Sequence, residues 1–328
     1  MSTLATPILV LADHQGSDAE GWTLSPASAQ VLTLARTLTS ADVVAVSLTS
    51  TPDLGALGAL GVAKVLVPGL DDAAPRVSAL VGDAVAACLR TDAFGALLLA
   101  SSYRGREVAA RISALVDSGV VADAVALETD GEALIATTTA LAGSWSNRLR
   151  ASGPTPIAVI RSGSVDAPMV EVPVAPIVVE VPVAISAEAG AVEVVSSTAQ
   201  SGDGRVSLSD ASTVVVAGRG TNGDMSVVES LADELGAAIG ATRVVCDEGW
   251  APRAMQIGQT GASISPNLYI GLGVSGAIHH TVGMQSSAHI VAVCDDPDAP
   301  IFEIADFGVV GDLFEVVPQA LEALRAAR

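Results

Sequence analysis

The chain has 328 residues, 50% of them hydrophobic and 16% charged, which is enough apolar material to fill more than one hydrophobic core. Its net charge of -20 excludes nucleic acid as a partner, because phosphates are bound by clustered Lys and Arg. No run approaches the ~18 consecutive apolar residues of a membrane-spanning helix, and the first residues contain neither a charged leader nor a cleavage pattern, so we expect a cytoplasmic protein without direct membrane insertion.

The first part of the chain alternates strand-like and helix-like segments. Ser25 followed by Pro26 is typical of an N-cap and a first-turn proline that begin a helix. Continuous apolar strands separated by amphipathic helices predict a mostly parallel sheet covered on both faces, with shorter β-like runs completing the domain. We expect strands at 8–12, 41–48, 64–67, 96–100, 122–128, 133–139 and 157–161, and helices at 26–38, 77–89 and 104–115.

Proline interrupts the segment 165–195, which repeats Val-Pro and Glu-Val steps. Proline every few residues excludes a helix or a central strand, so we expect an extended segment, either an edge strand or a crossing arm. The following stretch, 197–212, has the composition of a linker. These features predict an N-terminal α/β domain over 1–205 and a second domain over 206–328.

The second domain begins with a β-branched strand, a glycine-rich turn that contains Arg219, and a helix. Backbone amides in such a turn face a ligand at the carboxyl edge of a sheet. We expect strands at 213–217, 242–246 and 268–272, and helices at 224–239 and 275–284. Arg243 therefore also lies near a sheet edge, and with Arg219 and Arg253 it provides the only basic side chains between Val206 and Leu324.

Gly271, Gly273 and Gly276 form a G-x-G-x-x-G pattern between a predicted strand and a predicted helix. This pattern is typical of dinucleotide binding, and Asp295 follows near the spacing at which a ribose contact is expected. In a chain with 31 glycines, simple turn and packing roles are an equally good interpretation.

No metal site or catalytic group is indicated by the Cys and His positions. Cys88, Cys246 and Cys294 lie far apart without a CxxC pair, so we expect three reduced thiols. The 4 histidines show no metal-binding spacing with acids or cysteines. A general base or nucleophile is equally unsupported.

Six segments carry a resemblance to a known family. From residue 213 to about 324 the chain contains, in order, GRG, ATRVVCDEGW, MQIGQTG, LYIGLGVSGAIHH, IVAVCDDPDAPIFEIADFG and VVGDLFEVVP. These segments closely resemble the carboxyl-terminal domain of electron transfer flavoprotein alpha subunits. ILVLADH, LSPAS and SSYRGREVAARISALV extend the resemblance, more loosely, through the first domain.

The resemblance implies an α/β fold with an N-terminal Rossmann-like sheet that contacts a beta subunit and a doubly wound FAD-binding domain of the DHS-like type. It implies a heterodimer that carries one FAD, with AMP held by the beta subunit. Such a carrier, without turnover of its own, takes electrons from flavin dehydrogenases, such as the acyl-CoA dehydrogenases of fatty-acid β-oxidation. It passes them to a membrane quinone oxidoreductase through an anionic semiquinone. Two alternatives remain: an electron-bifurcating variant, and a non-redox nucleotide-binding module that has lost flavin or binds NAD through its glycine pattern.

The same resemblance assigns roles to individual residues. Arg243 matches an arginine against the isoalloxazine ring, the Thr260 hydroxyl lies near N5, and the His280 imidazolium approaches the O2 edge. Asp312 and Leu313 match positions beside the adenine half. The expected cofactor-binding residues are Arg219, Thr242, Arg243, Gln256, Ile257, Gly258, Gln259, Thr260, Ser275, Gly276, Ala277, Ile278, His279, His280, Cys294, Asp312 and Leu313. His279 replaces a common Gln and Cys294 a common Asn in the family pattern.

Each of these roles has a plainer alternative. Arg219 and Arg243 are also suited to salt bridges with neighbouring carboxylates, and Asp312 to an N-cap. His279 and His280 are expected to be a pair on one helix, with one ring exposed and the other packed. Trp250 is expected to serve packing or an interface.

Overall fold

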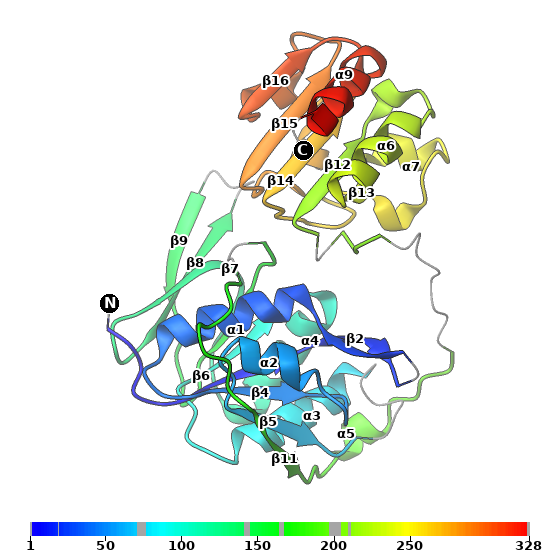
Figure 1. Cartoon of the computed structure of the whole chain (residues 1–328). Helices are drawn as coiled ribbons and strands as arrows, with labels where there is room; N and C mark the ends of the chain where they lie inside the picture. The colour runs from blue at the N-terminus through cyan, green and yellow to red at the C-terminus, as the bar shows by residue number, and fades with distance from the viewer. Residues whose placement is uncertain are drawn as a thin grey trace. The chain divides into compact units, whose positions relative to one another are not determined.

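The computed structural model describes residues 2–18, 20–70, 77–140, 145–163, 167–196, 205–208 and 211–326. The chain forms two compact units (Figure 1), the first Met1–Ala140 with Ser146–Ala199 and the second Leu141–Trp145 with Gln200–Arg328. Most of the linker expected at 197–212 lies outside the described residues.

The first unit is built on a nine-stranded sheet with the order β11-β5-β4-β1-β6-β10-β7-β8-β9. All neighbours from β11 to β7 are parallel, and β8 is antiparallel to β7. The strands are β1 (Ile8–Ala12), β4 (Val43–Ser47), β5 (Lys64–Pro68), β6 (Ala96–Ala100), β7 (Val120–Thr129), β8 (Leu134–Ala140), β9 (Trp145–Arg150), β10 (Ile157–Ile160) and β11 (Ile177–Val181). The predicted mostly parallel sheet is confirmed.

Helices cover both faces of this sheet, as the sequence predicts (Figure 1). α1 (Pro26–Leu38) and α2 (Leu54–Ala59) pack into the core on one face, and α3 (Ser78–Leu89) and α4 (Tyr103–Val116) into the core on the other. α1 begins where expected, because the Ser25 hydroxyl accepts a hydrogen bond from the backbone of Ser28.

Four parts of the first unit were not predicted: a hairpin, α2, β9 and a short helix in the segment 165–195. All residues of β9 are exposed, so it lacks the continuous apolar character by which the other strands were found. The hairpin of β2 (His14–Ser17) and β3 (Gly21–Leu24) lacks an apolar pattern, since its residues are exposed or half-buried. α2 was missed because a six-residue helix spans too few turns for periodicity to show.

The proline-rich segment contains an edge strand, one of the two arrangements expected. It passes α2, where the Val174 amide donates to the Gly58 carbonyl (3.1 Å), and then adds β11 beside β5. A Cβ on Gly58 would lie 2.2 Å from the Val174 carbonyl oxygen, so this close approach requires glycine. The segment also contains a short helix, α5 (Ala187–Gly190), which was not expected; it begins at a Ser186 cap, where the prolines have ended.

Asp83 ties this segment to the helices of the first unit. Its buried carboxylate accepts bonds from Arg111 Nη2 (2.7 Å) and from the Ser186 amide (2.8 Å). Burial raises the pKa of Asp83, but the hydrogen bonds from Ser186 and Arg111 outweigh it, and the pKa is lowered.

We expect Asp83→Asn to lower the free energy of unfolding of the first unit by about 3 kcal/mol, because Arg111 is left without its counter-charge. The measurement is urea unfolding followed by circular dichroism. The matched control is Glu128→Gln, which removes the exposed pair with Arg148 (3.1 Å) and should cost less than about 0.5 kcal/mol. Equal losses in the two variants would contradict a buried anchor at Asp83.

The second unit contains a five-stranded, wholly parallel sheet with the order β13-β12-β14-β15-β16. The strands are β12 (Thr213–Ala217), β13 (Ala238–Ala241), β14 (Leu268–Leu272), β15 (His289–Cys294) and β16 (Phe307–Val310). The chain moves to one side of β12 for β13 and to the other side for β14. This is a doubly wound sheet whose topological switch point lies between β12 and β14, which confirms the predicted fold class.

α6 (Ser226–Leu235) and α9 (Leu313–Ala326) pack side by side on one face of this sheet (Figure 1), together with α7 (Arg243–Asp247). The other face is covered by the segments 256–266 and 274–284 and by a 3-10 turn at Pro300–Glu303. The second segment contains a single helical turn, α8 (Ile278–Thr281). Among the described residues, no helix has both the length and the apolar character needed to cross a bilayer.

In the second unit one predicted helix is present but shorter than expected, and two further predicted elements are wrong. The helix expected at 224–239 ends at Leu235, because Gly236 adopts a left-handed conformation (φ +61°) that caps it. The strand expected at 242–246 is instead α7. The true strand, β13, was missed because three of its four residues, Ala238, Gly240 and Ala241, have low β-propensity. The helix expected at 275–284 is reduced to α8.

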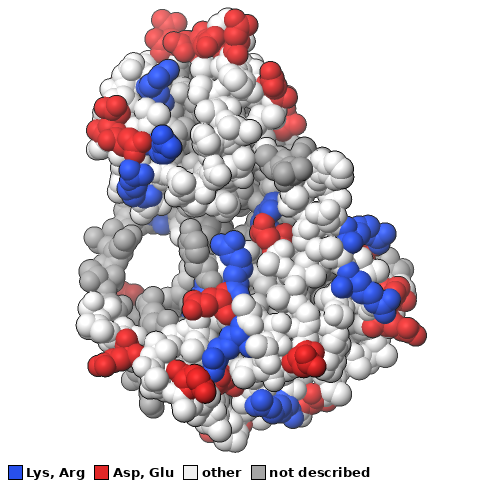
Figure 2. Space-filling model, turned by 180° about the vertical axis from the view of Figure 1, so that it is seen from behind, with Lys and Arg blue, Asp and Glu red and all other residues white. Residues whose placement is uncertain are grey.

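On the face shown in Figure 2, acidic side chains lie on both units with basic ones among them, and much of the surface between them is uncharged.

Candidate functional site

Segments that contain the sequence-predicted residues meet at one edge of the second sheet. Because the five strands are parallel, their carboxyl ends share this edge. The residues that follow the strands there are Arg219 after β12, Thr242 and Arg243 after β13, Ser275 and Gly276 after β14, Cys294 at the end of β15, and Asp312 and Leu313 after β16. In doubly wound sheets this edge, at the switch point, is where ligands bind.

Glycines hold the turns after β12 and β14 directly against each other. The Gly220 amide donates to the Gly273 carbonyl (3.1 Å), and a Cβ on Gly218 would lie 2.0 Å from that same oxygen. Gly276, with φ +82°, leaves only 2.3 Å between an added Cβ and the backbone nitrogen of Ile301. Two glycines of the G-x-G-x-x-G pattern, Gly273 and Gly276, thus have close backbone neighbours within the protein. This favours the interpretation that the glycines serve turns and packing over the interpretation that they form a dinucleotide-binding loop.

The segment 256–262 forms a second wall of the site beside α8. The Ile257 amide donates to the Ala241 carbonyl (2.9 Å), and the Gln259 amide to the His279 carbonyl (2.8 Å). Gly258 has φ +140°, and a Cβ there would lie 2.4 Å from the His279 carbonyl oxygen. The two segments can approach this closely only because residue 258 is glycine.

His279 and His280 point in different directions, as predicted. His279 is exposed, and its Nδ1 lies 2.8 Å from Gln259 Oε1. His280 is only 6% exposed. Its Nδ1 lies 3.1 Å from the Ile257 carbonyl oxygen and must donate to it, since a carbonyl only accepts.

The tautomer of His280 follows from this contact. With the proton on Nδ1, Nε2 accepts from the Tyr269 hydroxyl at 2.8 Å. Burial lowers the pKa of His280 to about 4, so the ring is neutral at neutral pH. An imidazolium was expected here from the family resemblance, whereas this structure holds a neutral ring with both nitrogens bonded. Tyr269 is fully buried, and burial raises the pKa of its phenol.

Arg219 and Arg243 differ in their partners. Arg243 Nε lies 3.4 Å from Asp247 Oδ2, so Arg243 makes a salt bridge with a neighbouring carboxylate. The Arg219 side chain is exposed and makes no ion pair or hydrogen bond with any residue that the structure describes. Its charge is available to an anion at the edge where the turns after β12 and β14 meet.

The remaining predicted residues divide into exposed and buried positions. Asp312 Oδ1 accepts from the Phe314 amide (2.8 Å), so its N-cap role for α9 is confirmed. Leu313 and Cys294 are buried in the two cores of the unit, and burial raises the pKa of the Cys294 thiol. The other exposed members are Gln259, Thr260, Ser275, Ala277 and Ile278; Thr242 is half-buried, and Gln256, Ile257, Gly258 and Gly276 are buried.

Three neighbours of these residues were not predicted as part of the site. Asp247 and Arg253 join Arg243 in one ion-pair cluster, and Tyr269 is bonded to His280. The four-residue spacing of Arg243 and Asp247 would have indicated a helix pair, had that segment not been interpreted as a strand. Trp250 packs against the core of this unit, one of its two expected roles.

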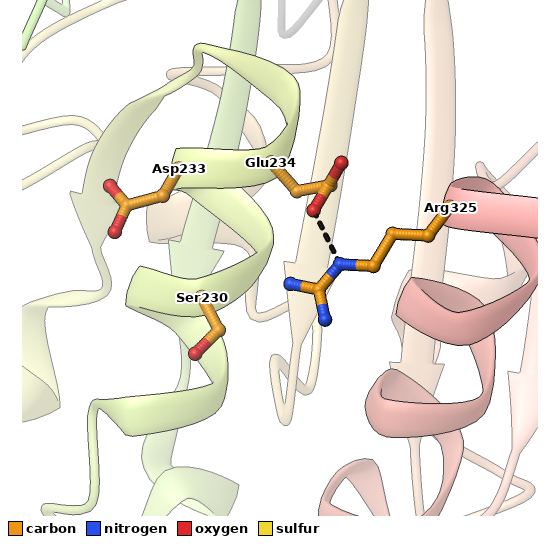
Figure 3. Close-up of a pocket in the computed structure, with 4 residues that line it drawn as sticks. All are labelled: Ser230, Asp233, Glu234 and Arg325. Carbon is orange, nitrogen blue, oxygen red and sulfur yellow. Dashed lines mark hydrogen bonds and ion pairs between the residues drawn. The ribbon is translucent and has the colours of Figure 1, made fainter. Parts of the chain in front are cut away.

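The side chains at this edge suit an anionic cofactor with polar ring atoms. Arg219 supplies a cation without an ion-pair partner among the described residues, and the exposed residues Thr260 and Ser275 supply hydroxyls. A pocket of about 350 Å³ elsewhere in the unit, between α6 and α9, is lined by Ser230, Asp233, Glu234 and Arg325 (Figure 3). Glu234 and Arg325 form an ion pair there (2.8 Å), near the end of α6 that leads to the amino end of β13. That pocket contains none of the predicted residues.

The fold and this edge define a doubly wound domain that binds a nucleotide cofactor. Residues 9–200 match the family model described as the electron transfer flavoprotein domain, and residues 207–285 match the electron transfer flavoprotein FAD-binding domain. The chain belongs to the electron transfer flavoprotein family and resembles its alpha subunits along nearly its whole length. The second match confirms FAD, the cofactor expected from the sequence.

Similar proteins support the same family. An electron transfer flavoprotein subunit alpha of Mycobacterium leprae is 41% identical over 324 residues, covering 98% of this chain and 98% of its own. The subunit alpha of Mycobacterium tuberculosis H37Rv is 41% identical over 325 residues, covering 98% of this chain and 99% of its own. That of Paracoccus denitrificans is 52% identical over 117 residues, 35% of this chain and 38% of its own.

Proposed function

We propose that this chain is the FAD-carrying alpha subunit of a heterodimeric electron transfer flavoprotein. It pairs with a beta subunit that holds AMP, accepts electrons from flavin dehydrogenases such as the acyl-CoA dehydrogenases of fatty-acid β-oxidation, and delivers them to a membrane quinone oxidoreductase from the cytoplasm. The observation that carries the proposal is the shared carboxyl edge. There Arg219, which has no partner among the described residues, and the exposed residues Thr260 and Ser275 lie with the glycine-packed turns. The names of its relatives support an alpha subunit with a different partner subunit.

FAD supplies one-electron chemistry when bound, and the chain's own residues hold and tune it. In this proposal Arg219 and Thr242 contact FAD, Arg243 lies against the ring, and the Thr260 hydroxyl donates towards N5. A guanidinium near the ring would offset negative charge that develops there, because the dielectric constant of such a site is low.

His280 has a different part in the proposal from the one expected from the sequence. Because its ring is neutral and bonded to Ile257 and Tyr269, it contributes no positive charge. It holds the segment 256–260 in place against β14. The positive charge near the ring then comes from Arg243, with Arg253 close by on the shared Asp247.

The test is to produce the chain together with its beta partner. The complex is expected to be yellow, to contain one FAD, and to pass through a red anionic semiquinone during anaerobic reduction. A colourless complex that takes up no added FAD would contradict the proposal. The NAD-binding alternative has less support, because Gly273 and Gly276 pack against backbone and α8 is a single turn.

A further inference from the structure

Three side chains form a hydrogen-bonded series beneath the exposed Thr260 hydroxyl. Arg253 Nη1 donates to Gln256 Oε1 (3.0 Å), and Gln256 Nε2 donates to Thr260 Oγ1 (2.9 Å). Gln256 is only 2% exposed, while Thr260 is exposed. The buried amide thus lies between a charged donor and a hydroxyl at the site surface.

The direction of this series is fixed by chemistry. A guanidinium has only donors, so the end of Gln256 that faces Arg253 must be its oxygen. The amide nitrogen must then face Thr260 and donate to it. A hydroxyl that accepts from a neighbour on one lone pair keeps its own proton for a different acceptor.

Backbone contacts hold Gln256 in place, so its position does not depend on Arg253 alone. The backbone amide of Gln256 donates to the backbone carbonyl of Arg253 (3.1 Å), and the backbone carbonyl of Gln256 accepts from the backbone amide of Ala262 (2.7 Å). What Arg253 adds is the orientation of the side-chain amide, because without it the oxygen and nitrogen ends could exchange places.

We propose that Arg253 and Gln256 are positioning residues that force the Thr260 hydroxyl to act as a donor towards bound ligand. The inference rests on the proposed function in one respect, that the ligand's acceptor is the flavin. Asp247 completes the arrangement. Its Oδ1 lies 2.6 Å from Arg253 Nη2, and its Oδ2 lies 3.4 Å from Arg243 Nε. One carboxylate therefore positions both Arg253, which orients the Gln256 side chain, and Arg243, which is assigned to the flavin ring.

The decisive variant is Gln256→Glu, which keeps the size of the side chain and its bond to Arg253. A carboxylate only accepts, so it would draw the Thr260 proton inward and remove the outward donor. In the full complex, Gln256→Glu and Thr260→Val should each weaken FAD binding about threefold to tenfold. With FAD labelled with ¹⁵N at N5, both should move the N5 resonance in the same direction.

Three controls separate orientation from charge and from folding. Thr260→Ser keeps the hydroxyl and should match the wild type. Ser263→Asp adds one negative charge at an exposed position of the same loop and should not reproduce the N5 shift. Arg253→Lys remains a pure donor and should preserve the N5 signal, whereas Arg253→Gln can present either end and should weaken it.

A second readout needs no ligand. In the complex without FAD, the buried side-chain amide protons of Gln256 should exchange slowly, and Arg253→Gln should accelerate exchange while Arg253→Lys should not. Equal exchange in the two Arg253 variants, or an unchanged N5 resonance in Gln256→Glu beside a shifted one in Thr260→Val, would overturn the inference. Failure of the wild-type complex to bind FAD would instead contradict the proposed function, and the exchange measurement would still decide the orienting role of Arg253.

Discussion

Gly276→Ala is expected to destabilise the second unit by more than about 3 kcal/mol and to abolish FAD binding. Gly276 has φ +82°, a conformation that costs an alanine about 1–2 kcal/mol. The added Cβ would also lie 2.3 Å from the nitrogen and 2.6 Å from the Cα of Ile301, both backbone atoms that cannot rotate away. Relief of this contact requires Ile301, which is fully buried, to leave the core.

Ile301, which the added Cβ would displace, also makes a hydrogen bond within the site. The Ile301 amide donates to the Ser275 carbonyl (3.1 Å), which fixes the turn that follows β14. Moving Ile301 breaks this bond and displaces Ser275, Gly276 and the start of α8 together. The measurements are urea unfolding of the complex and titration with FAD followed by flavin fluorescence.

Gly236→Ala is the matched control. Gly236 also has a positive φ (+61°), but no atom lies within 4 Å of the added Cβ. This variant should cost only about 1 kcal/mol and leave FAD binding unchanged. If both variants lost the same stability, backbone conformation alone would explain Gly276, and the close contact with Ile301 would have no role.

The parallel core of the first sheet was predictable because strands such as β1, β4, β6 and β10 are continuous apolar runs separated by helices. Strands such as β1 and β6 are buried along their whole length, so each strand residue had to be apolar. In the second unit the signals are weaker. Three of the four buried residues of β13 are Ala or Gly, and the helix end at Gly236 was missed because an isolated glycine is also tolerated within a helix.

The residues of the candidate site were expected from the family resemblance, and their contacts were not expected from the sequence. Parallel strands place their carboxyl ends at one edge, so the turn with Arg219 was expected there, whereas Arg243 was expected at the start of a strand and instead follows β13. Which side chain faces outward depends on rotamers and on partners distant in the sequence. His280 illustrates this, because the protonation state of its ring depends on burial and on contacts with Tyr269 and Ile257. Nothing in the sequence indicates that either residue is a partner of this histidine.

Acid is expected to destabilise the second unit through His280. The pKa of His280 is lowered to about 4 in the folded protein, against 6.5 for an ordinary histidine, because burial disfavours the charged ring. Between these values the unfolded chain binds a proton that the folded chain does not. The contribution of His280 to stability is therefore complete above about pH 6.5 and declines as the pH falls towards 4, by about 3 kcal/mol in total.

The comparison that isolates this effect uses His280→Gln and His279→Gln. Glutamine at 280 can still donate to the Ile257 carbonyl but does not titrate, so the difference in stability between it and the wild type should shrink by up to about 3 kcal/mol from pH 7 to pH 4. His279→Gln alters the exposed neighbour and should keep the wild-type slope. NMR titration of the imidazole protons gives a direct check, and a His280 ring that titrates near pH 6.5 would contradict the argument.

The same titration is expected to affect the cofactor. His280 Nδ1 holds Ile257, whose segment continues to Thr260, and Nε2 holds the buried Tyr269. A protonated ring must donate from both nitrogens, so the Tyr269 hydroxyl loses its acceptor and has to turn within a closed core. Release of FAD on acidification should therefore follow the protonation of His280 and should lose that dependence in His280→Gln, as measured by flavin fluorescence between pH 7 and pH 4.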